Sequence, residues 1–420
     1  MMYVTKKLVL YLFLLLFIIL VNTSYGHKVL DVMSINQIYP TKDWKVVDNP
    51  TYHFSSNSGF SAVAALSAKS VWAVGYTYAD DSPDTRAGVS SATTGLPALI
   101  EQWNGNSWHI MNSPVIPGAS YVSLSSTAAL ASNNVWAIGG SYTTDYSVTQ
   151  QLIEHWDGKN WRIIKPPVVK DAAYSNLSGL SALAANNIWA VGGYAHPEDR
   201  GLHHALIEHW DGNSWHFVLS PATTRLTNSV YEELQSVVAI NAKDIWAVGV
   251  SLTSSYAHRS LIGHWNGQSW SIVDGNDRLA SSKSQRTLNA VAARSSSDVW
   301  AVGQANDRGP TQSLIKHWNG KSWSDIPGPG STGTKQVADG GNLLGLTVLA
   351  TNDIWAVGSY SDQPRIEHWN GKVWTIVASP TLTAGTSMLS GIVHTADARQ
   401  LWAVGSTNQQ GLSETRTDEC

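Results

Sequence analysis

Short apolar runs and polar turns alternate along most of the chain, and they recur as one repeated unit. Its first phrase is Val71-Trp72-Ala73-Val74-Gly75, in which a tryptophan lies inside an apolar run that a glycine ends. The phrase returns with small changes at residues 135, 188, 245, 299, 354 and 401. A second phrase begins at Glu101 and reads EQWNGNSW, and variants of it begin at residues 154, 208, 263, 316 and 367. Successive first-phrase tryptophans are 47 to 64 residues apart, and we number seven repeats by this phrase.

Each repeat predicts four short β-strands. The first is a run of small and apolar residues, such as 177–183, and a polar turn separates it from the second strand, which holds the first phrase. The third strand ends in Glu-His-Trp in three repeats and in a variant of it in three others, and an Asp-Gly or Asn-Gly pair then indicates a type I′ turn, in which both central residues have positive φ. The fourth strand starts at the second tryptophan and alternates, as in 215–221, where a proline ends it. A repeat of about 50 residues made of four strands is typical of a β-propeller blade.

The two ends of the chain predict how the repeats close on one another. Residues 44–50 match a fourth strand with no first three before it, whereas residues 389–405 supply strands one and two of a last repeat. Residues 411–420 are expected to supply its third strand, although the second phrase is missing there. We therefore expect an all-β protein, a seven-bladed β-propeller of four-stranded antiparallel blades, closed by an N-terminal strand that completes the last blade. All 20 tryptophans then have a place in the repeat, which predicts that they pack between neighbouring blades.

The first 26 residues differ from the rest. Lys6 and Lys7 precede an unbroken apolar run of 14 residues, and small residues follow just before His27. This pattern predicts a secretory signal peptide over 1–26, one propeller domain over 27–420, and a secreted or cell-surface location. As a helix, the run spans about 21 Å, which is short of the ~30 Å hydrocarbon core of a membrane. An uncleaved signal anchor is the alternative.

Composition narrows the choice of partners. The chain has 27 basic and 31 acidic residues, a net charge of −4, which argues against a nucleic-acid partner because such proteins are usually strongly basic. The single cysteine, Cys420, leaves no intramolecular disulfide and no cysteine-based metal site. We expect a monomer with no cofactor and no membrane span after signal cleavage.

The glycine pairs Gly139-Gly140 and Gly192-Gly193, each followed by an aromatic–turn–tryptophan segment, resemble the kelch repeats of galactose-oxidase-type propellers. The resemblance covers roughly residues 38–415, with two departures: five repeats keep only the first glycine, and tryptophan replaces the usual tyrosine. It implies a secreted bacterial propeller of a tryptophan-rich type that serves as a scaffold. The copper radical chemistry of galactose oxidase depends on a Tyr–Cys cross-link, and the only cysteine here is the last residue.

Five histidines recur at one third-strand position and invite a reading as a metal site. Each lies in a different repeat, and stacked sheets are about 10 Å apart, whereas two histidine nitrogens on one zinc ion lie within about 4 Å. We therefore predict blade-to-blade packing and hydrogen bonding for these histidines, and no metal site. The glutamates that precede them are replaced in two repeats, by Gly263 and Lys316, which favours a surface position. The histidines are His155, His209, His264, His317 and His368.

Candidate binding residues lie where the repeats differ, in the loops between strands two and three and between one blade and the next, which are expected on one face. This loop face offers Tyr, Asp, His and Arg, which suit stacking and hydrogen bonding to sugars or a peptide. The strand-two-to-three candidates are Tyr76, Tyr78, Asp80, Tyr142, Tyr194, His196, Asp199, Arg200, Tyr256, Arg259, Asp307, Arg308, Tyr360 and Arg365. Further loop residues of the same face include Tyr121, Tyr174, His203, His204, Tyr231, Glu232, Glu233 and Asp277.

Two classes of function fit this sequence. The first is an exported, non-catalytic propeller that binds a glycan, a cell-wall polymer or a protein partner through its loop face. The alternative is a carbohydrate-active enzyme, a glycoside hydrolase or polysaccharide lyase, with carboxylates on the same face. It would need two carboxyl groups about 5–9.5 Å apart. Asp80, Asp199, Glu232 and Asp307 are available for that role, but no motif selects catalytic residues among them.

Overall fold

The computed structural model describes residues 44–50, 57–78, 95–143, 149–200, 202–220, 229–253, 257–277, 284–307, 311–329, 341–380, 385–408 and 410–417. The expected signal peptide, the candidates Asp80, Tyr256 and Arg308, and Cys420 lie outside these ranges. Described residues all belong to one compact unit, 42–420.

The described part of the chain is all-β, and its one helical turn is the 3-10 turn η1 (Pro197–Asp199). Four antiparallel strands recur in each repeat. Repeats 1 to 3 form a continuous sheet of twelve strands, which β3–β8 pairing and a β10–β12 bridge hold together. Its strands are β2 (Ser58–Ser67), β3 (Ser70–Tyr78), β5 (Leu99–Trp103) and β6 (Trp108–Ile110); β8 (Ala119–Ala131), β9 (Asn134–Thr143), β10 (Thr149–Trp156) and β11 (Trp161–Ile163); and β12 (Tyr174–Ala184), β13 (Asn187–Ala195), β14 (His204–Trp210) and β15 (Trp215–Phe217). A two-stranded sheet pairs β4 (Leu96–Pro97) with β7 (Val115–Ile116).

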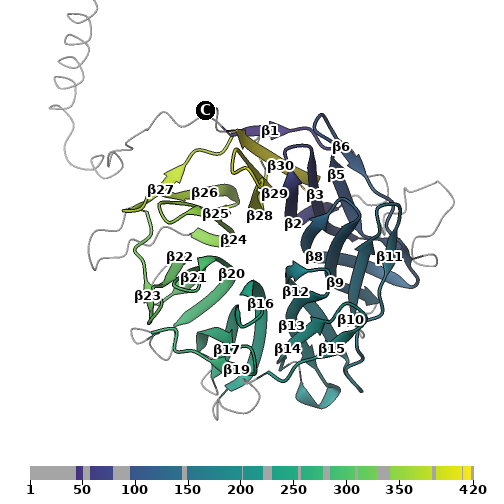
Figure 1. The fold of residues 1–420 in the computed structure, drawn as a ribbon, viewed down its shortest axis with the longest axis horizontal. Coiled ribbons are helices and arrows are strands. Elements are labelled where there is room, and N and C mark those ends of the chain that lie inside the picture. The colour runs from purple at the N-terminus through teal and green to yellow at the C-terminus, as the bar shows by residue number, and fades with distance from the viewer. Residues whose placement is uncertain are drawn as a thin grey trace, which may run out of the picture. The chain divides into compact units, whose positions relative to one another are not determined.

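Repeats 4 to 6 each form a separate four-stranded sheet. Figure 1 shows that the first strands of the repeats (for example β8, β16 and β24) lie toward the middle of this unit and the short fourth strands toward its outside. The strands are β16 (Ser229–Asn241), β17 (Asp244–Thr253), β18 (His258–Trp265) and β19 (Trp270–Ile272); β20 (Gln285–Ser295), β21 (Asp298–Asn306), β22 (Gln312–Trp318) and β23 (Trp323–Asp325); and β24 (Gly341–Ala350), β25 (Asp353–Tyr360), β26 (Gln363–Trp369) and β27 (Trp374–Val377).

The last sheet combines both ends of the described chain. It contains β28 (Ser387–His394), β29 (Gln400–Thr407), β30 (Gln410–Thr417) and the N-terminal strand β1 (Lys45–Val47), which pairs antiparallel with β30. Trp44 contacts Trp355 edge-on at 6.0 Å, as the fourth-strand tryptophans of other repeats do. Arg416 takes the place of the third-strand tryptophan, and its guanidinium lies 4.4 Å from the centre of the same Trp355 ring. A cation–π contact thus replaces a Trp–Trp contact.

The tryptophans pack between neighbouring repeats, as predicted. Trp246 of repeat 4 contacts both Trp318 and Trp323 of repeat 5, with ring centres 4.9 and 5.5 Å apart, and it is 1% exposed. Repeats 7 and 1 make the same contact, because Trp402 lies 5.0 Å from Trp103 and 5.3 Å from Trp108. Each second-strand tryptophan therefore connects its own sheet to the next one.

The repeated histidines belong to hydrogen-bonded clusters inside single repeats. His155 Nε2 lies 2.9 Å from Asn134 Oδ1, which also accepts a hydrogen bond from the Trp136 indole at 2.8 Å, and the His155 ring stacks on Trp136 at 4.3 Å. Among the described residues, no group of three or more His, Cys, Asp or Glu side chains is placed to hold a metal ion. Hydrogen bonding is confirmed for these histidines, but the predicted packing between blades is wrong, because each ring packs on the tryptophan of its own repeat.

The predicted type I′ turn is wrong. Trp156 pairs with Trp161, so four residues connect strands three and four, and among the turn residues only Gly158 has a positive φ, of 91°. Asp157 Oδ1 instead accepts hydrogen bonds from the backbone N–H groups of Lys159 and Asn160, at 2.9 and 2.8 Å. The aspartate stabilises the turn with its side chain, so it needs no left-handed backbone.

The surface position expected for the repeated glutamates is also wrong. Glu101, Glu154, Glu208 and Glu367 are 0–2% exposed, and Glu414 takes the same buried position in repeat 7. At three junctions, the residue five positions after a fourth-strand tryptophan reaches the glutamate of the next repeat: Asn49 donates to Glu101 at 2.9 Å, Ser113 to Glu154 at 2.9 Å, and Ser379 to Glu414 at 2.8 Å. We call this contact the carboxyl clasp.

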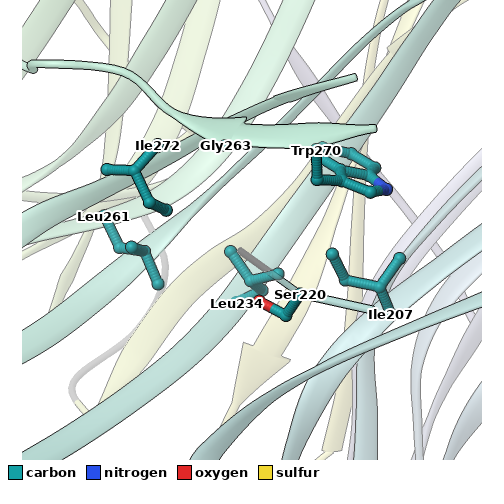
Figure 2. Close-up of a pocket in the computed structure, with 7 residues that line it drawn as sticks. All are labelled: Ile207, Ser220, Leu234, Leu261, Gly263, Trp270 and Ile272. Atoms are coloured by element: carbon teal, nitrogen blue, oxygen red, sulfur yellow. The ribbon is translucent and has the colours of Figure 1, made fainter. Parts of the chain in front are cut away.

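Where the glutamate is absent, the clasp changes with it. In repeat 5, Lys316 donates to the carbonyl oxygen of Gly275, which occupies the same position after Trp270, at 2.7 Å. In repeat 4, Gly263 has no side chain, and a small cavity lined by Ser220, Leu261, Trp270 and apolar neighbours lies beside it (Figure 2). Gly263 and Lys316 are therefore buried variants of one junction and not signs of a solvent-exposed position.

Candidate functional site

Seven aromatic rings of repeats 1 to 4 form a stacked surface at the loop end of the sheets, which we call the aromatic arc. Tyr78 and Tyr121 are cross-strand partners on β3 and β8, and their rings stack at 4.2 Å. Tyr121 and Tyr142 are partners on β8 and β9, at 4.9 Å. His203 lies between Tyr174 and Tyr231, at 4.2 and 4.7 Å. The arc consists of Tyr76, Tyr78, Tyr121, Tyr142, Tyr174, His203 and Tyr231, all of them half-buried.

The repeat itself positions the arc. Tyr121, Tyr174 and Tyr231 each stand three residues before the buried leucine of a first strand, so three successive sheets present a ring at the same level. Figure 1 shows the strands that carry them, β8, β12 and β16, side by side. These residues were expected in loops between blades, but they belong to the strands themselves.

The second glycine of the two Gly-Gly pairs has a local function here. A Cβ atom at Gly140 would collide with the side-chain oxygen of Asn176, and one at Gly193 would lie 3.1 Å from Glu233 Cγ. Asn176 and Glu233 occupy equivalent positions in repeats 3 and 4, next to the arc. The missing side chains therefore make room for the polar groups of the following repeat.

Glu233 is the charged centre of the arc. Its carboxylate accepts hydrogen bonds from the hydroxyls of Tyr231 and, at 3.4 Å, Tyr174, and Oε2 lies 3.4 Å from His203 Nδ1. Burial acts to raise the pKa of Glu233, but the hydrogen bonds from His203 and Tyr231 outweigh it and hold that pKa below its usual value. The Glu233 side chain keeps 12% of its surface exposed.

The phenols around this carboxylate stay protonated. Burial, and then the negative charge of Glu233, raise the pKa of Tyr142, Tyr174 and Tyr231. The effect of the Glu233 charge on the pKa of Tyr142 is smaller than that of burial. The site is an ionised carboxylate framed by neutral hydroxyl donors and aromatic rings, and it can bind a partner by hydrogen bonds and charge.

In repeats 5 and 6, charged side chains of the loop end form ion pairs with one another. Arg286 is 1% exposed and forms a two-point contact with Asp307, at 2.9 and 2.6 Å, and a further hydrogen bond to Asp325 at 2.7 Å. Arg365, 6% exposed, donates to Glu367 at 2.8 Å, while Tyr360 beside it is 44% exposed. Asp307 and Arg365 therefore lie in internal ion pairs. Only indirect signs of this pairing are present in the sequence: Arg286 stands where most first strands have a small residue, and Lys316 stands where most third strands have a glutamate.

The remaining candidates form a separate loop cluster in repeat 3. Asp199 Oδ2 accepts a hydrogen bond from the His196 backbone at 2.7 Å and lies 3.1 Å from His204 Nε2. These contacts, the backbone bond first, lower the pKa of Asp199. Tyr194 packs against His196 and His204, at 5.6 and 5.2 Å, and Arg200 beside them is exposed. Arg259 is half-buried on β18.

Carboxyl groups with a raised pKa lie between the repeats and not on the arc. Burial raises the pKa of Glu154 and Glu208 to about 8, and that of Glu101 and Glu414 to about 7. A glycosidase needs such an acid beside an ionised partner at the substrate. Of the carboxyls considered for that role in the described chain, the pKa of Asp199 and of Asp307 is lowered.

Comparison with known proteins adds the fold class. No family model matches the chain, and no curated protein matches it. Among solved structures, a chain of the crystal structure of the mitotic checkpoint complex aligns with a TM-score of 0.54 and 12% identity, over 95% of this chain and 100% of that chain. Together with the repeated four-stranded sheets, this likeness defines an all-β, β-propeller-like repeat protein. No helix in the described ranges is long and apolar enough to cross a membrane.

Proposed function

We propose that this chain is an exported, kelch-like, seven-bladed propeller over residues 27–420, and that it is a non-catalytic scaffold which binds a protein partner through the aromatic arc. The β1–β30 pairing and the Trp103–Trp402 contact support closure of the last repeat onto the first. The pattern of residues 1–26 supports export.

The observation that carries the binding function is the aromatic arc itself. Tyrosine is enriched in protein-binding surfaces because a rigid amphipathic ring gives contact area and a hydrogen bond at little cost in conformational entropy. Here the rings span repeats 1 to 4, while the equivalent region of repeats 5 and 6 contains internal ion pairs. The solved neighbour comes from a protein complex, which agrees with a protein partner.

A protein partner is favoured over a glycan because the arc covers its own ring faces. Sugars bind flat against exposed aromatic faces, whereas the Tyr78–Tyr121 and Tyr174–His203 stacks, both at 4.2 Å, occupy faces of these rings. The ring edges and hydroxyl groups remain, and these suit the polar groups and side chains of a protein.

Site-specific photo-cross-linking in the source cells tests the function. A benzophenone amino acid at Tyr142 should yield a discrete cross-linked partner, and the same group at Ile376, 58% exposed on the outer strand β27, is the matched control. The purified partner should then bind wild-type protein, and Tyr121→Ala with Tyr142→Ala should weaken that binding. Equal cross-linking at both positions, or saturable binding of an oligosaccharide that the same double variant abolishes, would contradict a protein-binding arc.

A further inference from the structure

We propose that the Glu233 end of the aromatic arc receives a basic side chain, the ammonium group of a lysine or the guanidinium group of an arginine, from the protein partner. This inference rests on the proposed function and names the chemistry of the partner at that site. The observations behind it are the ion pairing of the loop end, the free capacity of the carboxylate and the rings around it.

Among the described residues, an arginine pairs with each of two other carboxylates, and none pairs with Glu233. Asp307 is paired with Arg286 at 2.6 Å and Glu367 with Arg365 at 2.8 Å. Within the described ranges, the basic side chain in contact with Glu233 is the imidazole of His203, at 3.4 Å, which carries a positive charge only when it is protonated. A partly buried carboxylate gains most from a planar or compact cation that approaches closely, and a histidine at 3.4 Å falls short of the ~2.7–2.9 Å of a good charge-assisted hydrogen bond.

The Glu233 carboxylate has room for a further donor. Oε2 is contacted by the Tyr231 hydroxyl and by His203, whereas Oε1 accepts from the Tyr174 hydroxyl at 3.4 Å, a long hydrogen bond. A carboxylate offers about four acceptor positions, so Oε1 can accept a shorter bond from an incoming N–H group. The 12% exposure of the side chain gives that group a route of approach from solvent.

The rings complete a site for a cation. The rings of Tyr174 and Tyr231 lie on either side of the His203 ring, which contacts Glu233. The negative charge of Glu233 also helps to raise the pKa of Tyr142. An ammonium or guanidinium group is attracted by the carboxylate and can donate to the phenol oxygens, and the methylene stem of lysine or arginine suits the apolar ring edges that the stacks leave uncovered. Neutral phenols add hydrogen-bond capacity without adding a competing positive charge.

Peptide binding to the full chain tests the inference. The probe is an array of short peptides in which every lysine is matched by acetyl-lysine and every arginine by citrulline, with affinities then measured in solution. We expect binding by a subset of basic peptides, and a loss of about tenfold or more in affinity for their neutral matches and for Glu233→Gln. Asp362→Asn is the matched control, because it removes one negative charge from an exposed turn of repeat 6 and should leave affinity unchanged.

The outcomes separate this inference from the proposed function. If peptides bind and Tyr142→Ala abolishes binding, but the neutral matches and Glu233→Gln bind as well as the originals, the cation site is wrong and the binding surface stands. Equal losses in Glu233→Gln and Asp362→Asn would indicate general charge attraction and overturn the cation site. Binding by no peptide also overturns it, and the cross-linking experiment then decides the proposed function alone. If Glu233→Gln lowers the melting temperature, the wild-type protein alone tests the cation site. Equal affinity for the basic peptides and for their citrulline and acetyl-lysine matches would then overturn it.

Discussion

The carboxyl clasp makes a quantitative prediction about stability and pH. Glu154 is fully buried, its carboxylate accepts from Ser113, and burial raises its pKa from 4.5 to about 8. The folded chain therefore keeps a proton on Glu154 that the unfolded chain loses. The stabilisation from this group is fully present below about pH 4.5 and is lost as pH rises through about 8.

The size of the effect follows from linkage. Each pH unit between the two pKa values costs the folded state ~1.4 kcal/mol per group. From pH 5 to pH 7.5, Glu154 alone should lower the free energy of unfolding by about 3 kcal/mol. Burial lowers the pKa of His155 and His209, which acts in the opposite direction near neutral pH, so the prediction concerns the difference between variant and wild type.

Glu154→Gln is the perturbation, because glutamine keeps the shape and the Ser113 contact but cannot ionise. Urea unfolding at pH 5.0, 6.0, 7.0 and 7.5 should show the wild type losing about 3 kcal/mol more than Glu154→Gln over this range. Glu198→Gln, at an exposed position on η1, is the matched control and should follow the wild type. Parallel pH profiles for wild type and Glu154→Gln would refute the buried, protonated clasp.

Three further predictions follow from the packing and the chain ends. Trp246→Ala should cost ~3–5 kcal/mol of unfolding free energy in denaturant titrations, because it removes contacts with two rings of the next repeat; unchanged stability would show that these rings contribute little. Gly249→Ala should prevent folding, because its Cβ would collide with the Glu233 carbonyl, whereas Gly193→Ala should fold and weaken partner binding through Glu233; circular dichroism and binding assays separate the two, and equal behaviour would contradict this reading. N-terminal sequencing of the exported protein should begin at His27, and retention of residues 1–26 would favour the signal anchor instead.

Repeated positions were the most predictable part of this molecule. The regular spacing of Trp246 and its equivalents predicts sheet-to-sheet packing, because a large ring recurring once per repeat has one neighbour in the next repeat. The hydrogen bonding of His155 and its equivalents was predicted correctly, but their packing was expected between blades and lies within each repeat. The type I′ turn was predicted wrongly, because the side chain of Asp157 stabilises a longer turn that the Asp-Gly pair alone does not reveal.

The repeated glutamates were wrongly predicted to be exposed, because their replacement by glycine and lysine in two repeats is typical of a surface position that tolerates substitution. Gly263 and Lys316 are explained only when the residue of the preceding repeat, Ser220 or Gly275, is considered with them. Such a pair is separated by about 40 residues, and a single sequence gives no reason to connect its members. Periodicity identifies equivalent positions, but it does not show which two of them touch.

For the candidate site, the sequence predicted many of the residues but not which of them lie together. Sequence reasoning named the tyrosines of the arc, yet they were spread over loops of four repeats together with Asp307 and Arg365, which the structure places in ion pairs. Repeats 5 and 6 each contain an arginine that the other repeats lack, and it pairs with a carboxylate of the same repeat, Arg286 with Asp307 and Arg365 with the repeated Glu367.

Glu233 instead contacts tyrosines and a histidine, and among the described residues no arginine or lysine pairs with it. Hydrogen bonds from His203 and Tyr231 outweigh the effect of burial and keep this carboxylate ionised in the folded chain. A charge that the fold holds ionised, with part of its side chain exposed, is available to a cation from outside, and this is the physical reason to look for the partner of this chain at Glu233.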